Sequence, residues 1–424
     1  MDIFSNFLVA GMNKKVPTKY GHKRYINFDN AASTPPFNAV LHRLTEDAEW
    51  YSSVHRGTGY KSKYTTEKYE QARTIIAEFV KADLAEDVVI FTKNTTDSVN
   101  KLVHYLPFLP GDTVVYTRME HHSNELPWQN HPHHCIGLNN GCINMDEMEF
   151  YLRKNKGKVK LVAVTGASNV TGNIPPVHTI AEIAHEFGAK ILVDCAQLAA
   201  HRPIQMLEKG DPRHLDFLAF SGHKMYAPFG SGVLIGPREL FSKGVPSQVG
   251  GGTLRGLLSD GIIWSNPPEN EEAGSPNVLG ALAMAESCKV LAEIGWNYLI
   301  SHEQKLIKYA LYQMQKIPKV TIFNENPQNR VGVISFQIEG ISHQETAALL
   351  ANNYGIGVRN GCFCARRYVL ELLGEDLTKM DKIWQNQPEK LPGLVRASFG
   401  CYNQIQEIDI LCEAIEEIIK EKRA

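Results

Sequence analysis

The chain has 424 residues and a formal net charge of −2, with 43% hydrophobic and 21% charged residues. This length allows two domains with a large core, and the composition is typical of a soluble globular protein. The small net charge gives no electrostatic basis for binding nucleic acid or an anionic membrane. The N-terminal apolar run is short and follows Asp2, unlike a signal peptide, and no apolar run could span a bilayer. We therefore expect a cytoplasmic protein with neither nucleic acid nor membrane as a partner.

Short β-branched segments alternate with amphipathic helical patterns between residues 88 and 235. The predicted strands are residues 88–91, 114–116, 161–164, 191–193, 217–220 and 233–235. One intervening helix has Ile180, Ile183, Ala184 and Phe187 at helical spacing. Strands that alternate with helices predict βαβ units and an α/β fold with a mainly parallel sheet.

The pattern changes in the last third of the chain. A long helical stretch begins after residue 275, and a predicted strand at 331–336 precedes a helix at 343–352. The chain ends in an amphipathic helix that includes Ile408, Leu411 and Ile415. We predict a large domain at residues 25–292 and a smaller α+β domain formed by residues 1–24 and 293–424. The polar segment 375–392, with two prolines, is interpreted as a surface loop or insertion.

A lysine and an aspartate follow two of the predicted strands. Lys224 ends the run Ser221-Gly222-His223-Lys224, and Asp194 follows an apolar strand with Gln197 three residues later. A lysine amine can hold an aldehyde cofactor as a Schiff base, and a carboxylate can keep a pyridine nitrogen protonated. These residues predict a pyridoxal 5′-phosphate (PLP) site. The alternatives are a solvated surface lysine and an aspartate that caps a helix.

Polar residues near the ends of other strands extend this prediction. Thr95 lies at the start of a predicted helix, where hydroxyls and backbone N–H groups can bind a phosphate, although an ordinary N-cap is the alternative. Ser221 and His223 could add phosphate contacts. His121 follows another strand and could stack on a pyridine ring and move protons. The histidine-rich segment 131–135 is interpreted as a polar loop, and we predict no metal site.

Two arginines and a pair of cysteines suggest how a substrate is handled. Arg396 lies in an apolar strand pattern and needs an anionic partner, either a substrate carboxylate or an internal carboxylate. Arg359 shows a weaker form of the same pattern. Cys362 and Cys364 form the only closely spaced pair among eight cysteines. Without a second pair, a reactive thiol is favoured over a zinc site, and a disulfide framework is not expected in the cytosol.

Taken in order, these segments resemble the class V aminotransferase family of fold-type I PLP enzymes, and most closely its SufS-like cysteine desulfurases and selenocysteine lyases. No single motif decides this, but the ordered set is specific and covers nearly the whole chain. The motifs that carry the resemblance are residues 28–33 (FDNAAS), 54–57 (VHRG), 120–124 (EHHSN), 127–128 (PW), 168–172 (SNVTG), 194–197 (DCAQ), 221–224 (SGHK), 273–277 (AGSPN) and 396–398 (RAS). The resemblance implies a large mainly parallel-sheet domain and a smaller α+β C-terminal domain.

The resemblance also implies roles for the cofactor-binding residues. Lys224 would hold PLP, Asp194 would pair with the ring nitrogen, Gln197 would bind the ring hydroxyl and His121 would stack on the ring. The phosphate would be bound by Thr95, Ser221 and His223, and by Ser275 from the second subunit of a homodimer.

The implied substrate is L-cysteine or a related amino acid. Asn169 and Arg396 would bind its carboxylate, with Arg359 and His55 also placed in the substrate site. Lys224 would remove the Cα proton, and the thiolate of Cys364 would then take the substrate sulfur as a persulfide. With L-cysteine as the substrate, the product released would be alanine. Arg359 could lower the thiol pKa. The sulfur would pass to an acceptor protein.

The cysteine segment departs from the SufS-like pattern. Cys362 is an additional thiol, and Gly-Cys-Phe-Cys at 361–364 is similar to the sulfurase domain of molybdenum cofactor sulfurases. Thirty-one residues separate Cys364 from Arg396, more than in the SufS-like group. The alternatives are another class V PLP enzyme, such as a selenocysteine lyase, C–S lyase, aminotransferase or epimerase, and a catalytically silent PLP-binding partner in sulfur trafficking.

Overall fold

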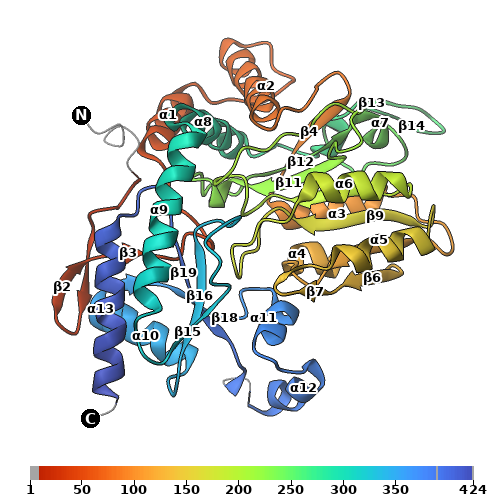
Figure 1. Cartoon of the computed structure of the whole chain (residues 1–424). Helices are drawn as coiled ribbons and strands as arrows, with labels where there is room; N and C mark the ends of the chain where they lie inside the picture. The colour runs from red at the N-terminus through yellow and green to blue at the C-terminus, as the bar shows by residue number, and fades with distance from the viewer. Residues whose placement is uncertain (1–8, 388–389, 423–424) are drawn as a thin grey trace.

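A seven-stranded sheet forms the centre of the computed structural model, which describes residues 9–387 and 390–422. The strand order is β4-β12-β11-β10-β9-β5-β6 (Figure 1). Neighbouring strands pair in parallel from β11 to β6, and only β12 runs antiparallel to both of its neighbours. The bounds are β4 Asp87–Thr92, β5 Thr113–Thr117, β6 His133–Ile136, β9 Val159–Thr165, β10 Lys190–Asp194, β11 Phe217–Ser221 and β12 Gly232–Pro237.

Helices cover both faces of this sheet. Successive residues of β9 point to opposite faces, so that Val162 and Val164 pack with Ile180 of α6 (Val177–Glu186), whereas Leu161 and Ala163 pack on the side of α3 (Thr95–Tyr105). A sheet buried on both faces requires continuously apolar strands, and all five residues of β11 are buried. The predicted α/β fold with a mainly parallel sheet is confirmed.

A second sheet lies beside the first and is entirely antiparallel. Its order is β15-β16-β19-β18, with β15 Val320–Phe323, β16 Val333–Ile338, β19 Leu394–Ser398 and β18 Arg359–Gly361. The helices that pack around it are α9 Trp296–Met314, α10 His343–Tyr354 and α13 Ile405–Glu421. The division into residues 25–292 and 1–24 plus 293–424 stays a prediction, and residues 1–8 lie outside the described part of the chain.

Two loop predictions differ from the structure. Residues 133–135 of the segment 131–135, interpreted as a polar loop, belong to the edge strand β6, where partial exposure of the strand accommodates two histidines. The segment 375–392 is not simply a loop, because it contains the helix α12 (Leu377–Asn386). Asp376 caps this helix by accepting a hydrogen bond from the Thr378 N–H at 2.8 Å. Leu370, Met380 and Leu391 form a small hydrophobic cluster that stabilises it.

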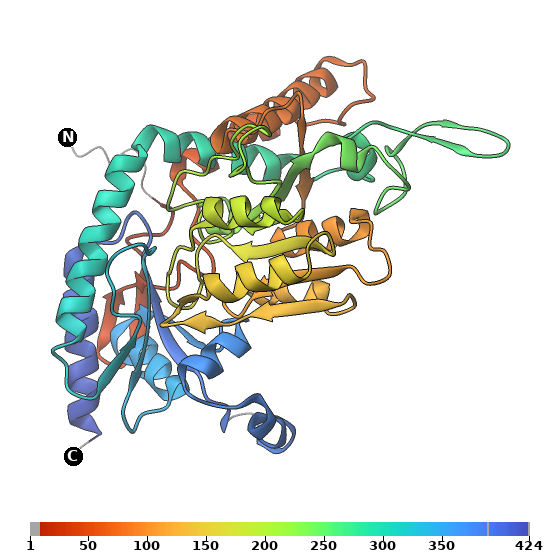
Figure 2. The same cartoon turned by 45° about the vertical axis from the view of Figure 1, so that its right-hand side comes forward.

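The remaining elements surround these two sheets. The helices are α1 Asn38–Trp50, α2 Tyr60–Val80, α4 His122–Glu125, α5 Met145–Lys154, α7 Arg238–Phe241, α8 Val278–Ile294 and α11 Arg366–Leu372, with short 3-10 turns η2 Leu126–Trp128, η3 Gly222–Lys224 and η4 Glu269–Glu271. The short strands are β1 Lys15–Thr18, β2 Gly21–Arg24, β3 Ile26–Asn27, β7 Leu138–Asn139, β8 Cys142–Ile143, β13 Leu254–Leu257, β14 Ile262–Trp264 and β17 Ile356–Gly357. The β13–β14 hairpin projects away from the body of the molecule (Figure 2).

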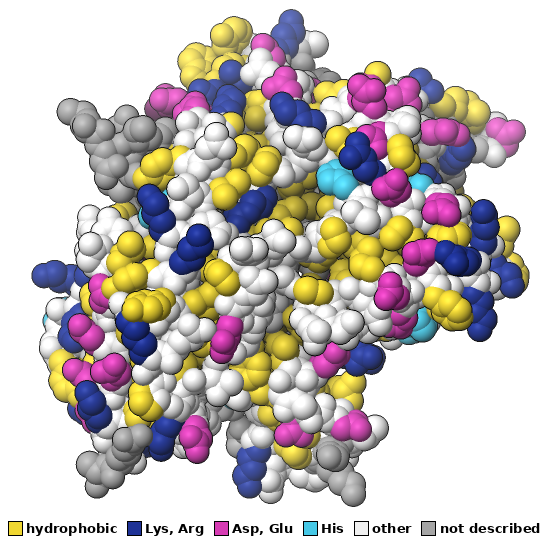
Figure 3. Space-filling view, viewed as in Figure 1, with side chains coloured by type: hydrophobic (Ala, Val, Ile, Leu, Met, Phe, Trp, Pro, Cys, Tyr) yellow, Lys and Arg dark blue, Asp and Glu magenta, His cyan; other side chains and the backbone are white. Residues whose placement is uncertain are grey.

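Charged side chains of both signs are interspersed over the face seen in Figure 3. No helix in the described ranges is both long enough and apolar enough to cross a membrane.

Candidate active site

One cavity brings together all but two of the residues predicted to form the site. It lies where β10 and β11 of the large sheet end, facing the small antiparallel sheet. The predicted residues that line it are Thr95, His121, Asn169, Asp194, Gln197, Ser221, His223, Lys224, Arg359, Cys364 and Arg396. In open α/β sheets, ligands bind at the carboxyl ends of the strands, and this cavity has that location.

Lys224 and Asp194 lie at the base of this cavity. Lys224 ends the 3-10 turn that follows β11, and it forms no hydrogen bond or ion pair with another described residue. Burial lowers the pKa of its amine to about 8, opposed by the Asp194 carboxylate. Asp194 is buried, and one of its oxygens accepts a hydrogen bond from the Ala196 N–H at 2.9 Å. Burial raises the pKa of Asp194, while Ala196 and Lys224 lower it.

The start of α3 meets the end of β11 at the side of the cavity. The Thr95 N–H donates to Ser221 Oγ at 2.8 Å, and the two hydroxyl oxygens are 2.7 Å apart. The N-cap is Asn94, whose side chain accepts from the Asp97 N–H, so the hydroxyl of Thr95 is not used as a cap. A Cβ on Gly232 would lie 2.6 Å from the Asn94 Cα, and glycine therefore allows this close approach. The arrangement presents two hydroxyls at a helix N-terminus, which suits a phosphate.

His121 is held as a neutral imidazole in one tautomer. Its Nδ1 accepts a hydrogen bond from the Ser123 N–H at 3.0 Å, which places the ring proton on Nε2. Burial and the nearby Lys224 lower its pKa to about 3. Burial, together with Lys224, also lowers the pKa of His223 to about 4. Both rings therefore remain neutral at physiological pH.

Two arginines lie opposite each other on neighbouring strands of the small sheet. Arg396 on β19 and Arg359 on β18 are paired residues in the register of these strands. Both interact with Asp29, at 3.3 Å from Arg396 and 3.8 Å from Arg359. Arg396 also donates to the Asn169 carbonyl at 2.9 Å, but its buried Nε has no partner among the described residues. The two guanidinium groups carry like charges and repel each other, and the single carboxylate of Asp29 balances only one of them. The remaining positive charge suits an anionic group of a substrate.

The loop that carries Cys364 is fixed by hydrogen bonds to its backbone. Asn169 Nδ2 donates to the Phe363 carbonyl at 2.7 Å, and the His122 N–H donates to the Cys364 carbonyl at 2.7 Å. Phe363 and Cys364 have φ values of 52° and 53°, in the left-handed region that residues other than glycine seldom adopt. The Phe363 ring packs under the Arg396 guanidinium, 4.8 Å from its centre. These contacts hold an uncommon backbone conformation that exposes Cys364 in the cavity.

The two cysteines of this loop have different surroundings. Cys364 is exposed and lines the cavity, whereas Cys362 is half-buried against the hydrophobic core and its thiol donates to the Pro392 carbonyl at 3.6 Å. Burial raises the pKa of the Cys362 thiol. The thiolate is the nucleophilic form of cysteine, so the geometry favours Cys364 as the reactive thiol.

His55 and Ser275 do not reach this cavity within the chain. They line a second cavity together with Arg56 and Arg255. His55 Nε2 lies 2.9 Å from Glu70 Oε1. The predicted roles of both residues in the site of Lys224 therefore require another subunit or a change in conformation.

Several residues in or beside the cavity were given no role from the sequence. Asp29 lies in the motif at residues 28–33 that contributes to the family resemblance. Its contact with Arg396 joins residues 367 positions apart, which local sequence spacing cannot indicate. Thr96, Ser123 and Phe363 line the cavity itself. His122 holds the cysteine loop through its backbone N–H, and only its position beside His121 could have indicated this.

The side chains fit the chemistry of PLP. The cavity offers an amine without a partner, a buried carboxylate for a ring nitrogen, a neutral imidazole and two hydroxyls at a helix N-terminus. These side chains match the aldehyde, ring nitrogen, ring and phosphate of PLP. We therefore infer that Lys224, Asp194, His121, Thr95 and Ser221 could hold this cofactor.

Comparisons with known proteins give a consistent result. Residues 26–411 match the aminotransferase class-V family. A cysteine desulfurase of Shigella sonnei is 32% identical over 402 residues, covering 92% of both chains. A probable cysteine desulfurase of Mycolicibacterium paratuberculosis is 33% identical, and the alignment covers 93% of this chain but 56% of that longer protein.

Solved structures show the same relation. The apo cysteine desulfurase of Thermococcus onnurineus NA1 is 33% identical, with a TM-score of 0.82 over 94% of this chain and 95% of its own. The cysteine desulfurase CsdA of Escherichia coli, in an S-sulfonic acid form, is 27% identical, with a TM-score of 0.77 over 93% and 95% of the two chains. The resemblance seen in the sequence is thereby confirmed, and the chain belongs to the class V aminotransferase family.

Proposed function

We propose that the protein is a PLP-dependent cysteine desulfurase that converts L-cysteine to L-alanine and receives the sulfur on Cys364. The observation that carries this proposal is the placement of the exposed Cys364 in the same cavity as Lys224 and Arg396. A reactive thiol has no general function in PLP chemistry, but it is required when sulfur must leave the substrate as a persulfide. The cysteine desulfurases to which the chain is similar support the proposal.

The cofactor site is proposed from the residues already described. Lys224 would bind the aldehyde carbon, Asp194 would hold a proton at the ring nitrogen, Gln197 would bind the ring hydroxyl and His121 would lie against the ring. The phosphate would be bound by Thr95, Ser221 and His223. When bound, PLP accepts the electron pair left on Cα and so allows bonds around that carbon to break.

The substrate carboxylate binds beside the two arginines. Arg396 contributes its unpartnered Nε, and Arg359 contributes a second positive charge. Asn169 holds the Phe363 carbonyl and accepts from Arg396 through its own carbonyl, so it positions the cysteine loop and the arginine together. The family resemblance instead implies that the Asn169 side chain binds the substrate carboxylate directly, and that role stays a prediction.

The reaction divides between Lys224 and Cys364. As a free amine, Lys224 removes the Cα proton. The Cys364 thiolate attacks the substrate sulfur, so that a new S–S bond forms while the C–S bond breaks and its electron pair stays with the carbon. That β-carbon is then protonated and Lys224 returns a proton to Cα, which yields alanine and a persulfide on Cys364. The persulfide sulfur afterwards passes to an acceptor, which we propose to be a protein.

We propose that the active form is a cytoplasmic homodimer. His55 and Ser275 line a cavity separate from that of Lys224, so they can contribute to a cofactor site only across an interface or after a movement. In a dimer, Ser275 would reach the phosphate bound by the second subunit.

The first test of this function combines a spectrum with a product assay. The purified protein is expected to show visible absorption from bound PLP and to release alanine when L-cysteine is added. Absorption without alanine would favour another class V reaction or a catalytically silent PLP-binding partner. The absence of both would contradict PLP binding at Lys224.

Replacement of Arg396 by lysine is expected to raise the KM for L-cysteine by about 10-fold to 100-fold. The variant keeps the charge but loses the planar array of donors, and a hydrogen bond to a charged group contributes about 1.5–3 kcal/mol. Steady-state kinetics measure this effect. Arg153→Lys, an exposed residue of α5 that lines neither cavity, is the control and should leave this KM unchanged. An unchanged KM in Arg396→Lys would contradict carboxylate binding by Arg396.

The rate at which the cofactor-free protein captures PLP is expected to rise with pH and level off above about 8. Only the neutral amine attacks an aldehyde, and burial lowers the pKa of Lys224 to about 8. Below this value the neutral fraction falls about tenfold per pH unit. Stopped-flow absorbance would measure the rate. A midpoint near 10, as for an ordinary lysine, would show that the cavity does not depress this pKa.

A further inference from the structure

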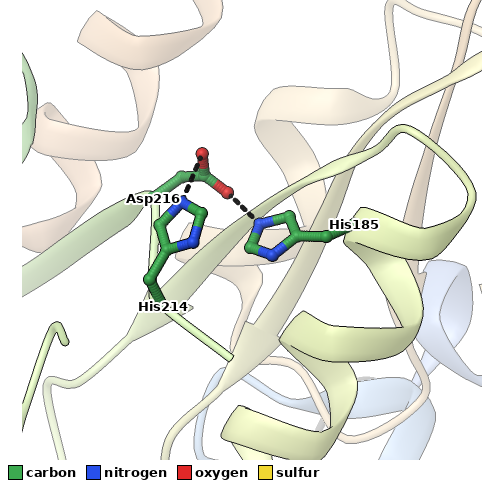
Figure 4. A group of neighbouring side chains, drawn as sticks. All are labelled: His185, His214 and Asp216. Atoms are coloured by element: carbon green, nitrogen blue, oxygen red, sulfur yellow. Dashed lines mark hydrogen bonds and ion pairs between the residues drawn. The ribbon is translucent and has the colours of Figure 1, made fainter. Parts of the chain in front are cut away.

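A cluster of two histidines and one aspartate lies at the opposite end of β11 from Lys224. Asp216 directly precedes β11, His214 lies in the loop before it, and His185 lies near the end of α6. Both imidazole rings point toward the Asp216 carboxylate (Figure 4). His185 Nε2 is 2.8 Å from Oδ2, and His214 Nε2 is 3.5 Å from Oδ1. Strand geometry places this cluster about 16 Å from the active-site end of β11.

The other nitrogen of each ring fixes its tautomer. His185 Nδ1 lies 2.7 Å from the Pro212 carbonyl, and His214 Nδ1 lies 2.9 Å from the Asp211 carbonyl. A carbonyl oxygen only accepts hydrogen bonds, so each Nδ1 carries a proton. In the neutral rings, both Nε2 atoms then present lone pairs to a carboxylate. This arrangement is repulsive unless a cation or additional protons lie between them.

Protons alone would crowd positive charge around one carboxylate. Lys190 Nζ already lies 2.8 Å from Asp216 Oδ1, and the two rings stack with centres 4.3 Å apart. Two stacked imidazolium rings beside an ammonium would repel one another. A single divalent ion supplies the same charge to the carboxylate while leaving both rings neutral.

We propose that His185, His214 and Asp216 form a binding site for a divalent transition-metal ion, with Zn²⁺ as its probe. The three ligand atoms lie within 4.8 Å of one another, a spacing that small side-chain rotations bring to the 2.0–2.2 Å bond lengths of zinc. Metal-binding histidines usually donate their second N–H to a carbonyl or carboxylate, as both rings do here. The nitrogen ligands favour a transition metal over Ca²⁺ or Mg²⁺.

The surroundings allow an ion to enter. The His185 and His214 side chains are each 18% exposed, and Lys190 is 49% exposed on a flexible stem that can move aside. Asp216 also accepts from the Ile191 N–H at 2.9 Å, which fixes the carboxylate. A bound ion would connect α6 to the loop that leads into β11, and so would stabilise the strand that precedes the turn containing Lys224. The sequence prediction of no metal missed this group because His185 and Asp216 are 31 residues apart.

The test is zinc binding by the chelator-treated, full-length protein, without substrate. We expect this site to retain one Zn²⁺ per chain after desalting. We also expect the melting temperature to rise by about 2–4 °C with excess zinc. His185→Gln and His214→Gln should each weaken zinc binding at least about tenfold. His178→Gln is the matched control, because its ring lies on the same helix and contacts the Arg213 carbonyl of the same loop but is not a ligand.

Cobalt(II) distinguishes this site from the cysteines. Nitrogen and oxygen ligation gives no thiolate charge-transfer band, so wild-type protein loaded with one equivalent of Co²⁺ should lack that band. The proposal is overturned if wild type and both histidine variants bind zinc equally, if none binds it, or if the first equivalent of cobalt shows thiolate ligation. Because no substrate is used, these outcomes do not depend on whether the protein is a desulfurase.

Discussion

Replacement of Lys224 by alanine is expected to abolish the visible absorption of bound PLP and to reduce alanine formation from L-cysteine by at least about 10³-fold. The side chain has two functions in the proposal, since it binds the aldehyde covalently and removes the Cα proton. General acid–base catalysis alone contributes about 10²–10⁴-fold. The fold should survive, because Lys224 forms no hydrogen bond or ion pair with another described residue.

The measurements are the absorption spectrum after PLP addition and desalting, the rate of alanine release and thermal unfolding. Lys93→Ala is the matched control, because Lys93 is an exposed lysine beside the helix that contains Thr95 and does not line the cavity. It should retain both absorption and activity. A Lys224→Ala variant that kept its visible absorption would show that another amine binds the cofactor.

Replacement of Cys364 by serine is expected to leave PLP binding intact while reducing alanine release from L-cysteine by about 10²-fold or more. A hydroxyl is a far weaker nucleophile toward sulfur than a thiolate, so the C–S bond has no acceptor for its sulfur. Cys364 is exposed, and the free energy of unfolding should therefore change by less than about 0.5 kcal/mol. The spectrum, the alanine assay and thermal unfolding separate these effects.

Cys362→Ser is the control within the same loop. Cys362 is turned toward the core and the Pro392 carbonyl, so its variant should still form a persulfide on Cys364 and should mainly alter transfer to an acceptor. Loss of the persulfide in this variant would contradict the assignment. Normal alanine release by Cys364→Ser would instead eliminate the persulfide mechanism and favour another class V reaction.

The large sheet was predictable because its strands are buried on both faces. Residues such as 191–193 and 217–220 form continuous apolar runs. Asp194 and Lys224, which are predicted to bind the cofactor, come after these runs. The edge strand β6 lacked that signal, since its exposed side carries histidines. The helix α12 was missed because its hydrophobic cluster draws on Leu370 and Leu391 from outside the helix.

The site itself was predictable only in part. Motif order indicated Lys224, Asp194, His121 and Arg396, all of which line one cavity. The role of Asp29 depends on contacts with two arginines more than 300 residues away, which no local pattern encodes. The separation of Ser275 from this cavity likewise reflects packing rather than motif order.

The most direct test of the central claim is mass spectrometry of the Cys364 peptide after reaction with L-cysteine and trapping of thiols. We predict one additional sulfur atom on Cys364, formed in step with one alanine per active site and absent from Cys364→Ser. Alanine formation without added sulfur on Cys364, or an unmodified peptide after full exposure to L-cysteine, would contradict the account.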